Sequence, residues 1–129
     1  MQIKTTTDYA VRIILTMARA NHPMTSKEIS KEIGVSSYYI QQILGILRLK
    51  GIVASKRGAV DGGYELLKAP EDISMMDIIE SFEQSIYVDA CLEKQIEGKD
   101  ALFHFWENFQ KQYEEHLRKT TIRDLLSAE

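Results

Sequence analysis

The sequence predicts a mostly α-helical fold with one small β-hairpin: a winged helix-turn-helix followed by a long C-terminal helix. Three observations support this prediction. Two amphipathic helical patterns flank a glycine-containing turn at 33–36, two strand-like segments then enclose a glycine-rich turn, and an aromatic-rich helical pattern covers 101–119. We therefore expect a winged helix-turn-helix domain over 1–83, a linker over 84–100, and a C-terminal helix with a tail over 101–129.

The first predicted helix covers residues 7–20, with Thr7 or Asp8 as its cap and His22-Pro23 after its end. The apolar residues that recur there at helical spacing are Ala10, Ile13, Ile14 and Met17. This spacing gives the helix one face that can be buried.

Capping signals place the next two helices. Thr25 and Glu28 form a capping box that starts a short second helix, and Gly34 is suited to end it in a left-handed conformation. Ser36 then caps a third helix, which Gly51 ends. The apolar positions of the third helix are Ile40, Ile43, Leu44 and Leu47. Two helices joined by so short a turn are typical of a helix-turn-helix.

A β-hairpin is expected directly after this motif. Residues 52–56 and 64–67 form the predicted strands, and the turn at 57–63 contains three glycines. Lys56 and Arg57 add positive charge at its tip, and the glycines allow the backbone to approach another molecule closely. A helix-turn-helix followed by a hairpin predicts a winged helix.

Two further capping boxes mark helices in the second half of the chain. Ser74 with Asp77 caps a fourth helix, and Thr121 with Asp124 caps a final short one. Residues 84–100 show no sustained period and are expected to be mostly loop, with at most a helical turn.

Composition and charge limit the class of protein. Hydrophobic residues make up 44% and charged residues 27% of the 129 residues, which is ordinary for a globular domain. One cysteine excludes an intramolecular disulfide framework and a four-thiolate metal site within one chain. The chain shows neither a signal peptide nor an apolar run long enough to span a membrane, so we expect a cytoplasmic protein without a membrane partner.

The charge is divided along the chain. Residues 1–68 carry a net charge of +5 and residues 69–129 carry −8, for a total of −3. This division suggests that the first half meets a polyanion, although short sequences also produce such splits by chance.

The last long helix predicts a homodimer. Its aromatic and apolar residues are more than a small winged helix needs to cover itself, and pairing with the same helix of a second chain would bury them. The alternative is that the helix folds back on its own domain. The predicted interface residues are Phe103, Phe105, Trp106, Phe109, Tyr113 and Leu117.

Several motifs, taken together, resemble those of the Rrf2 family of bacterial winged-helix transcriptional regulators. They include 7–12 at the first helix, 34–43 around the turn, 47–53 after it, Arg57-Gly58 with Gly62-Gly63-Tyr64 in the wing, and 120–125 in the tail. The resemblance implies a homodimer, a recognition helix in the major groove and a wing in the minor groove of double-stranded DNA. We expect such a regulator to be a repressor that binds a palindromic operator.

The expected DNA-binding residues lie on three segments. The resemblance itself implies six of them: Ser36, Tyr38, Tyr39, Gln41, Gln42 and Arg57. Residue chemistry agrees: a glutamine amide can bind an adenine edge, and an arginine suits a narrow minor groove. The expected residues are Lys4, Thr5, Thr7, Ser36, Tyr38, Tyr39, Gln41, Gln42, Arg48, Lys56, Arg57, Gly62 and Gly63. For some of them a structural role is the alternative: Ser36 as a cap only, Tyr39 turned inward, the two glutamines as a solvated face, and Arg57 paired with Asp61.

The linker departs from the iron–sulfur members of the family, which carry three closely spaced cysteines there. This chain has only Cys91, so we expect no iron–sulfur cluster and no other cofactor or metal. Cys91 is the candidate sensor, but the acidic Asp89 and Glu93 beside it should raise the pKa of its thiol and make it a weak sensor or none. Control through a regulatory protein or a small ligand between the wing domain and the tail is the remaining option.

Two other classes compete with a regulator. An enzyme is disfavoured because the histidines His22, His104 and His116 are scattered and no nucleophile elbow, P-loop or dinucleotide motif is present. A protein-interaction module would explain the aromatic helix but not a basic wing beside a helix-turn-helix. Steep salt dependence of binding would distinguish DNA from a protein partner.

Overall fold

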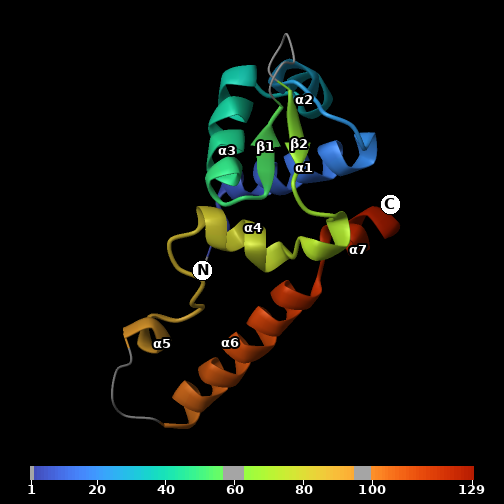
Figure 1. Cartoon of the computed structure of the whole chain (residues 1–129). Helices are drawn as coiled ribbons and strands as arrows, with labels where there is room; N and C mark the ends of the chain where they lie inside the picture. The colour runs from blue at the N-terminus through green and yellow to red at the C-terminus, as the bar shows by residue number, and fades with distance from the viewer. Residues whose placement is uncertain (1, 57–62, 95–99) are drawn as a thin grey trace.

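A computed structural model describes residues 2–56, 63–94 and 100–129, apart from the side chain of Cys91. The fold is mostly helical with one two-stranded antiparallel sheet, as predicted (Figure 1). In chain order the elements are α1 (Thr5–Ala20), α2 (Ser26–Ile33), α3 (Ser37–Leu49), β1 (Val53–Ser55), β2 (Tyr64–Leu66), the 3-10 helix η1 (Pro70–Asp72), α4 (Met75–Phe82), α5 (Ala90–Lys94), α6 (Ala101–Lys119) and α7 (Ile122–Ser127).

The first helix starts earlier than its sequence predicts. Lys4 is the N-cap, without a side-chain cap bond, so neither Thr7 nor Asp8 caps the helix. At the other end Asn21 adopts a left-handed conformation (φ 55°), and its N–H donates to the Met17 carbonyl. This closes the helix two residues before Pro23.

The helix-turn-helix has the predicted caps. The Thr25 hydroxyl accepts the Glu28 N–H and the Glu28 carboxylate accepts the Thr25 N–H, both at 3.1 Å. Gly34 ends α2 at φ 84°, and the Ser36 hydroxyl caps α3. The four predicted apolar residues of α3 are all buried, at no more than 1% exposure. Local sequence signals therefore determine this motif.

The hairpin pairs Val53 with Leu66 and Ser55 with Tyr64. The α1–α2 connection adds a further bridge, because Met24 and Tyr64 exchange backbone hydrogen bonds at 2.7 and 2.9 Å. The wing is thus attached to the helical core at its base. Its tip, residues 57–62, lies outside the described residues.

One hydrophobic core contains residues of all four helices α1, α2, α3 and α4, of the hairpin and of α7. The α6–α7 junction is held by a small bridge to the start of α4: the Met75 N–H donates to the Thr120 carbonyl (2.8 Å) and the Ile122 N–H to the Ile73 carbonyl (2.9 Å). Ile122 is fully buried in that core. This bridge fixes where α6 leaves the winged domain.

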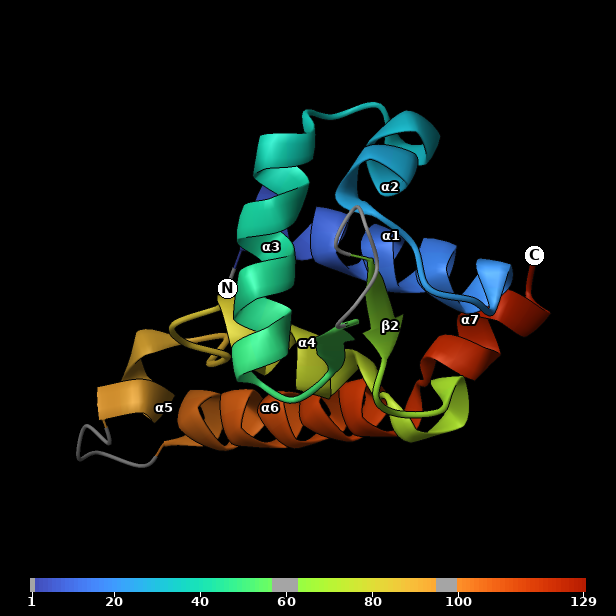
Figure 2. The same ribbon diagram turned by 45° about the horizontal axis from the view of Figure 1, so that its top comes forward.

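Helix α6 has the predicted bounds and runs away from the core, with α4 beside its C-terminal part and α5 beside its N-terminal end (Figures 1 and 2). The short helix α5 lies in the linker, where a helical turn at most is expected. None of the helices in the described ranges combines the length and the apolar character needed to cross a membrane.

Candidate nucleic-acid interface

The start of α3 presents one tyrosine and anchors another. The Tyr38 side chain is 69% exposed. The Ser36 hydroxyl accepts the Tyr39 N–H at 3.2 Å, so this oxygen serves the cap. Tyr39 is half-buried: its ring packs edge-on against Tyr9, with centroids 5.7 Å apart, and its hydroxyl lies 2.9 Å from that of Thr6. Tyr39 therefore links α3 to α1.

The remaining predicted residues of α3 are exposed. Gln41, Gln42 and Arg48 are exposed, and so is Lys56, which directly follows β1. The Gln41 Nε2 donates a hydrogen bond of 3.2 Å to the Ser26 Oγ on α2. Sequence reasoning missed Ser26, whose only signal was its place inside the capping box.

The start of α1 exposes fewer of the predicted DNA-binding residues than expected. Lys4 and Thr5 are exposed, but Thr7 is 1% exposed and its hydroxyl donates to the Glu83 carboxylate. Thr7 lies three and seven positions before the buried Ala10 and Ile14, on the same face of α1, so the structure buries this predicted phosphate contact. The same carboxylate accepts the Lys4 N–H at 3.0 Å, and the Lys4 ammonium donates to the Phe82 carbonyl at 3.3 Å.

Glu83 thereby ties the end of α4 to the start of α1. Burial alone would raise the pKa of Glu83, but the hydrogen bonds from the Thr7 hydroxyl and the Lys4 N–H, with the positive charge of Lys4, bring it below its usual value. Burial and the Glu83 charge together raise the pKa of Tyr113 on α6. No sequence pattern predicts this contact, because Glu83 and Thr7 are 76 positions apart.

At the base of the wing, one glycine that we expected to contact DNA is buried. Gly63 is buried, and its carbonyl accepts the Lys56 N–H at 2.7 Å. A Cβ at this position would lie 3.7 Å from the Met24 carbonyl oxygen. Gly63 therefore packs against the α1–α2 connection and is not exposed, in contrast to the DNA contact expected of it. The predicted DNA contacts Arg57 and Gly62 lie outside the described residues.

One face of α6 is apolar and open to solvent. Leu102, Phe105 and Phe109 are 59%, 57% and 42% exposed, and Gln110 is the single buried residue of the helix. The Phe105 and Phe109 rings stack at 6.3 Å. The other four predicted interface residues are partly exposed: Phe103, Trp106, Tyr113 and Leu117.

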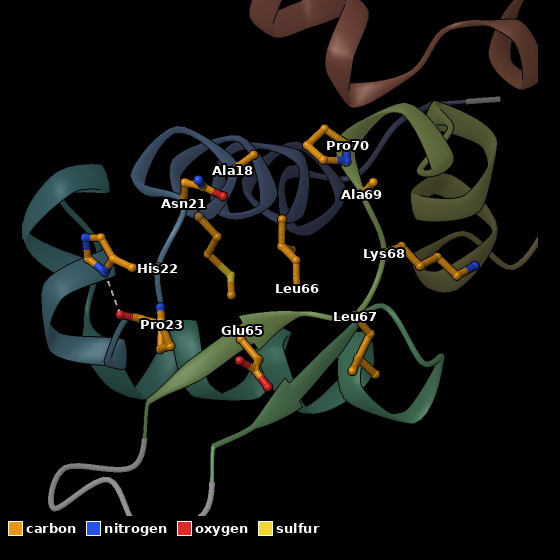
Figure 3. A pocket seen from close by; sticks show the side chains of 11 residues that line it. Ala18, Asn21, His22, Pro23, Glu65, Leu66, Leu67, Lys68, Ala69 and Pro70 are labelled. Carbon is orange, nitrogen blue, oxygen red and sulfur yellow. Dashed lines mark hydrogen bonds between the residues drawn. The ribbon is translucent and has the colours of Figure 1, made fainter.

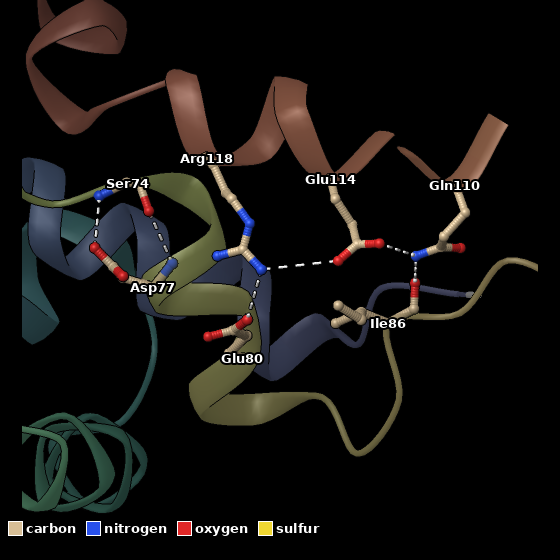
Figure 4. A network of polar contacts seen from close by, with 7 residues as sticks. All are labelled: Ser74, Asp77, Glu80, Ile86, Gln110, Glu114 and Arg118. Atoms are coloured by element: carbon tan, nitrogen blue, oxygen red, sulfur yellow. Dashed lines mark hydrogen bonds and ion pairs between the residues drawn. The ribbon is translucent and has the colours of Figure 1, made fainter. Parts of the chain in front are cut away.

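The opposite side of α6 holds the linker through Gln110 (Figure 4). The Gln110 Oε1 accepts the Val88 N–H at 2.8 Å, while its Nε2 donates to the Ile86 carbonyl at 3.0 Å and to the Glu114 carboxylate at 3.3 Å. Gln110 is 5% exposed. One side-chain amide therefore fixes two backbone groups of the segment that leads to α5. The backbone of α5 includes Cys91, whose side chain is outside the described part of the chain.

Ion pairs extend this polar side of α6 toward its C-terminus. Arg118 lies 3.7 Å from both Glu114 and Glu80, the latter on α4 (Figure 4). Each pair is largely exposed, so each contributes little stability on its own. Because Gln110, Glu114 and Arg118 are four positions apart, they line one face of the helix.

A groove of about 450 Å³ lies between the end of α1, the end of β2 and the start of η1. Met17, which is 2% exposed, and Leu66 contribute apolar surface to it. His22 turns toward the Pro23 carbonyl, and Glu65 points to the other side of its strand from Leu66 (Figure 3). The polar groups around the groove thus do not converge on a common point, as those of a specific ligand site do.

The donor atoms for a metal are few. The chain has one cysteine and three histidines, and within the described ranges no three His, Cys, Asp or Glu side chains gather closely enough to hold an ion. Iron–sulfur clusters are held by thiolates, in most cases four. The donor set of this chain does not fit such a cluster.

Known proteins share this sequence pattern. Residues 3–128 match the model of the Rrf2 family, described as iron-dependent transcriptional regulators. The HTH-type transcriptional regulator CymR of Bacillus subtilis is 33% identical over 129 residues, covering 98% of this chain and 91% of that protein. The HTH-type transcriptional regulator IscR of Erwinia tasmaniensis is 32% identical over 124 residues, covering 92% and 74%.

Solved structures agree with the sequence match. CymR (YrzC), the global cysteine regulator of B. subtilis, superposes with a TM-score of 0.87 at 30% identity, covering all of this chain and 98% of that one. IscR from T. potens gives 0.77 at 29% identity, covering 99% and 88%. The winged-helix fold and these matches show that the chain belongs to the Rrf2 family of DNA-binding transcriptional regulators.

Proposed function

We propose that the protein is a dimeric repressor that binds a palindromic operator, with α3 in the major groove and the wing in the minor groove. The observation that carries this proposal is the polarity of α3. Its inner residues are buried, whereas Tyr38 and Gln42, one turn apart, project into solvent with Arg48 further along. A helix with an anchored inner face and hydrogen-bonding groups outside can enter a major groove without reorganising.

The exposed side chains near α3 are suited to bind the DNA backbone. Lys4 and Thr5 start α1, and Lys56 directly follows β1, all of them exposed. Lysine and hydroxyl side chains bind phosphate oxygens and set the position of a protein on the duplex without selecting a sequence. Arg57, at the wing, is the proposed minor-groove contact.

The dimer proposal depends on the apolar face of α6. Three large side chains there are each more than 40% exposed, a surface that an isolated chain leaves in water. Pairing of α6 with its counterpart in a second chain would cover this face and place two α3 helices for two half-sites. Repression is the outcome we propose, since a dimer bound across a promoter would keep polymerase from it.

Binding selection from genomic fragments tests the DNA proposal. We expect the wild type to enrich one palindrome, with affinity falling steeply between about 50 and 200 mM salt. Gln42→Ala should lose about 1–3 kcal/mol of discrimination at one base pair of each half-site. Gln112→Ala, which changes an exposed glutamine of α6, is the matched control and should select as the wild type does. Failure of the wild type to enrich any sequence would refute the proposal.

Sedimentation measures the dimer separately. Phe105→Asp places a charge on the apolar face and should shift the protein toward monomer. Lys111→Asp is the control: it is exposed, changes the charge further, and lies about 120° around the helix from Phe105. Equal effects of the two substitutions would contradict the proposed interface.

We further propose that the regulator acts in the cytoplasm without a resident iron–sulfur cluster. The support is the donor set: one thiol per chain, where such clusters use several. Iron and sulfide analysis of protein purified without oxygen tests this proposal, and a stoichiometric cluster would refute it. Small-ligand control through the groove beside β2 has weaker support, because its polar groups do not converge.

A further inference from the structure

The two neighbouring glutamines of α3 differ in their surroundings. Gln41 is exposed, but its Nε2 donates to the Ser26 Oγ of α2 at 3.2 Å. Gln42 is also exposed, and within the described ranges its amide makes no hydrogen bond. One amide is therefore held by a partner on α2, whereas its neighbour has no such partner among the described residues.

Ser26 is a rigid anchor for this bond. It is the first residue of α2 and only 8% exposed. The capping box of Thr25 and Glu28 fixes the backbone on either side of it, and Ile29, one turn later, is fully buried in the core. The position of the Ser26 oxygen is therefore determined by α2 itself, independently of any bound DNA.

We propose that Ser26 is a positioning residue that orients the Gln41 amide toward an adenine of the operator. A glutamine amide has two N–H groups and one carbonyl oxygen. The bond to Ser26 occupies one N–H, which leaves the second N–H and Oε1. This donor–acceptor pair matches the N7 acceptor and N6 donor that adenine presents in the major groove.

The advantage of this arrangement is that Gln41 is ordered before DNA arrives. A long side chain that is free in solution loses conformational freedom when it binds, and a side chain already held loses less. Gln41 should therefore discriminate its base pair more sharply than the unrestrained Gln42. This inference rests on the proposed function, because it requires that α3 enters the major groove.

The test uses the selected operator with each of the four base pairs placed in turn at the position that Gln41→Ala identifies. Ser26→Ala removes the anchor and should reduce the preference for adenine there by about three- to tenfold, while discrimination at other positions stays unchanged. Ser26→Thr keeps the oxygen and should retain the preference. Adding Ser26→Ala to Gln41→Ala should change nothing further at this base pair, because the two residues act through one amide.

The outcomes are separable. Equal loss of affinity on every sequence after Ser26→Ala would mean that Ser26 only stabilises α2, and it would overturn the inference. An adenine preference that Ser26→Ala leaves unchanged would overturn it too. So would a result in which the base preferred at this position, and lost in Ser26→Ala, is not adenine. In each of these three cases the wild type still selects a palindrome, so the proposed function stands. If the wild type selects no sequence, the proposed function and this inference fail together.

Discussion

Replacing Gln110 tests whether one buried amide fixes the linker to α6. In Gln110→Ala the Val88 N–H and the Ile86 carbonyl lose their partners, and the bond to Glu114 is lost as well. A net hydrogen bond is worth about 0.5–1.5 kcal/mol, and an unpaired buried group costs more. Val88 and Ile86 are only half-buried, so water can replace part of the loss. We expect a loss of about 2 kcal/mol in the free energy of unfolding.

The hydrogen bonds of Gln110 to Val88 and Ile86 form a polar clamp between α6 and the linker. Two measurements separate the loss of this clamp from a general effect on the helix. Denaturant unfolding, at one protein concentration for all variants, gives the free energy. Amide hydrogen exchange gives the local effect, which should be greatest at the Val88 N–H. Asn108→Ala is the matched control, because it removes an exposed amide from the same helix and should leave both readouts near the wild type.

Gln110→Glu sharpens the test by adding pH dependence. The introduced carboxylate can still accept the Val88 N–H, but it faces the Ile86 carbonyl and the Glu114 carboxylate. These neighbours disfavour its charged form, so its pKa in the folded protein should be raised. The variant should therefore be least stable near neutral pH and recover as pH falls. Unchanged Val88 exchange in Gln110→Ala would refute the reasoning.

Three further substitutions test one local contact and the backbone conformation at a helix end. The pKa of Glu83 lies below its ordinary value of 4.5. The charged carboxylate therefore stabilises the fold above that pH, and this contribution is lost as the pH falls through the folded-state pKa. Urea unfolding should show Glu83→Gln less stable than the wild type at pH 7, with the difference in free energy of unfolding narrowing below about pH 4. Gly34 has φ 84° and open space where a Cβ would lie, with no atom within 4 Å, so Gly34→Ala should cost about 1–2 kcal/mol of unfolding free energy from backbone strain alone. Gly45→Ala, in the middle of α3 with equally open space, should instead be neutral or stabilising, and equal losses at both glycines would contradict this explanation.

Helix boundaries set by short-range chemistry were predicted correctly. The capping boxes at Thr25, Ser74 and Thr121 each form the two expected hydrogen bonds, because both partners lie within three residues. The start of α1 was missed because its N-cap, Lys4, makes no side-chain cap bond and so leaves no local capping signal. The burial of Gly63 was missed because its glycine-rich surroundings suggest an exposed turn, although Met24 covers it. Long-range contacts leave no periodic signal.

The apolar stripe of α6 predicts the helix but not which side of it the chain buries, and the orientation of α6 shows why. A stripe of apolar residues ordinarily marks the side that a helix buries in its own domain. Here the side toward the winged domain and linker also carries Gln110, Glu114 and Arg118, which use polar contacts to hold Ile86, Val88 and Glu80. Because that side is occupied, Leu102, Phe105 and Phe109 remain turned outward. The polar clamp and the exposed aromatic face are thus two consequences of one helix orientation, so loosening the clamp should also disturb whatever covers that face.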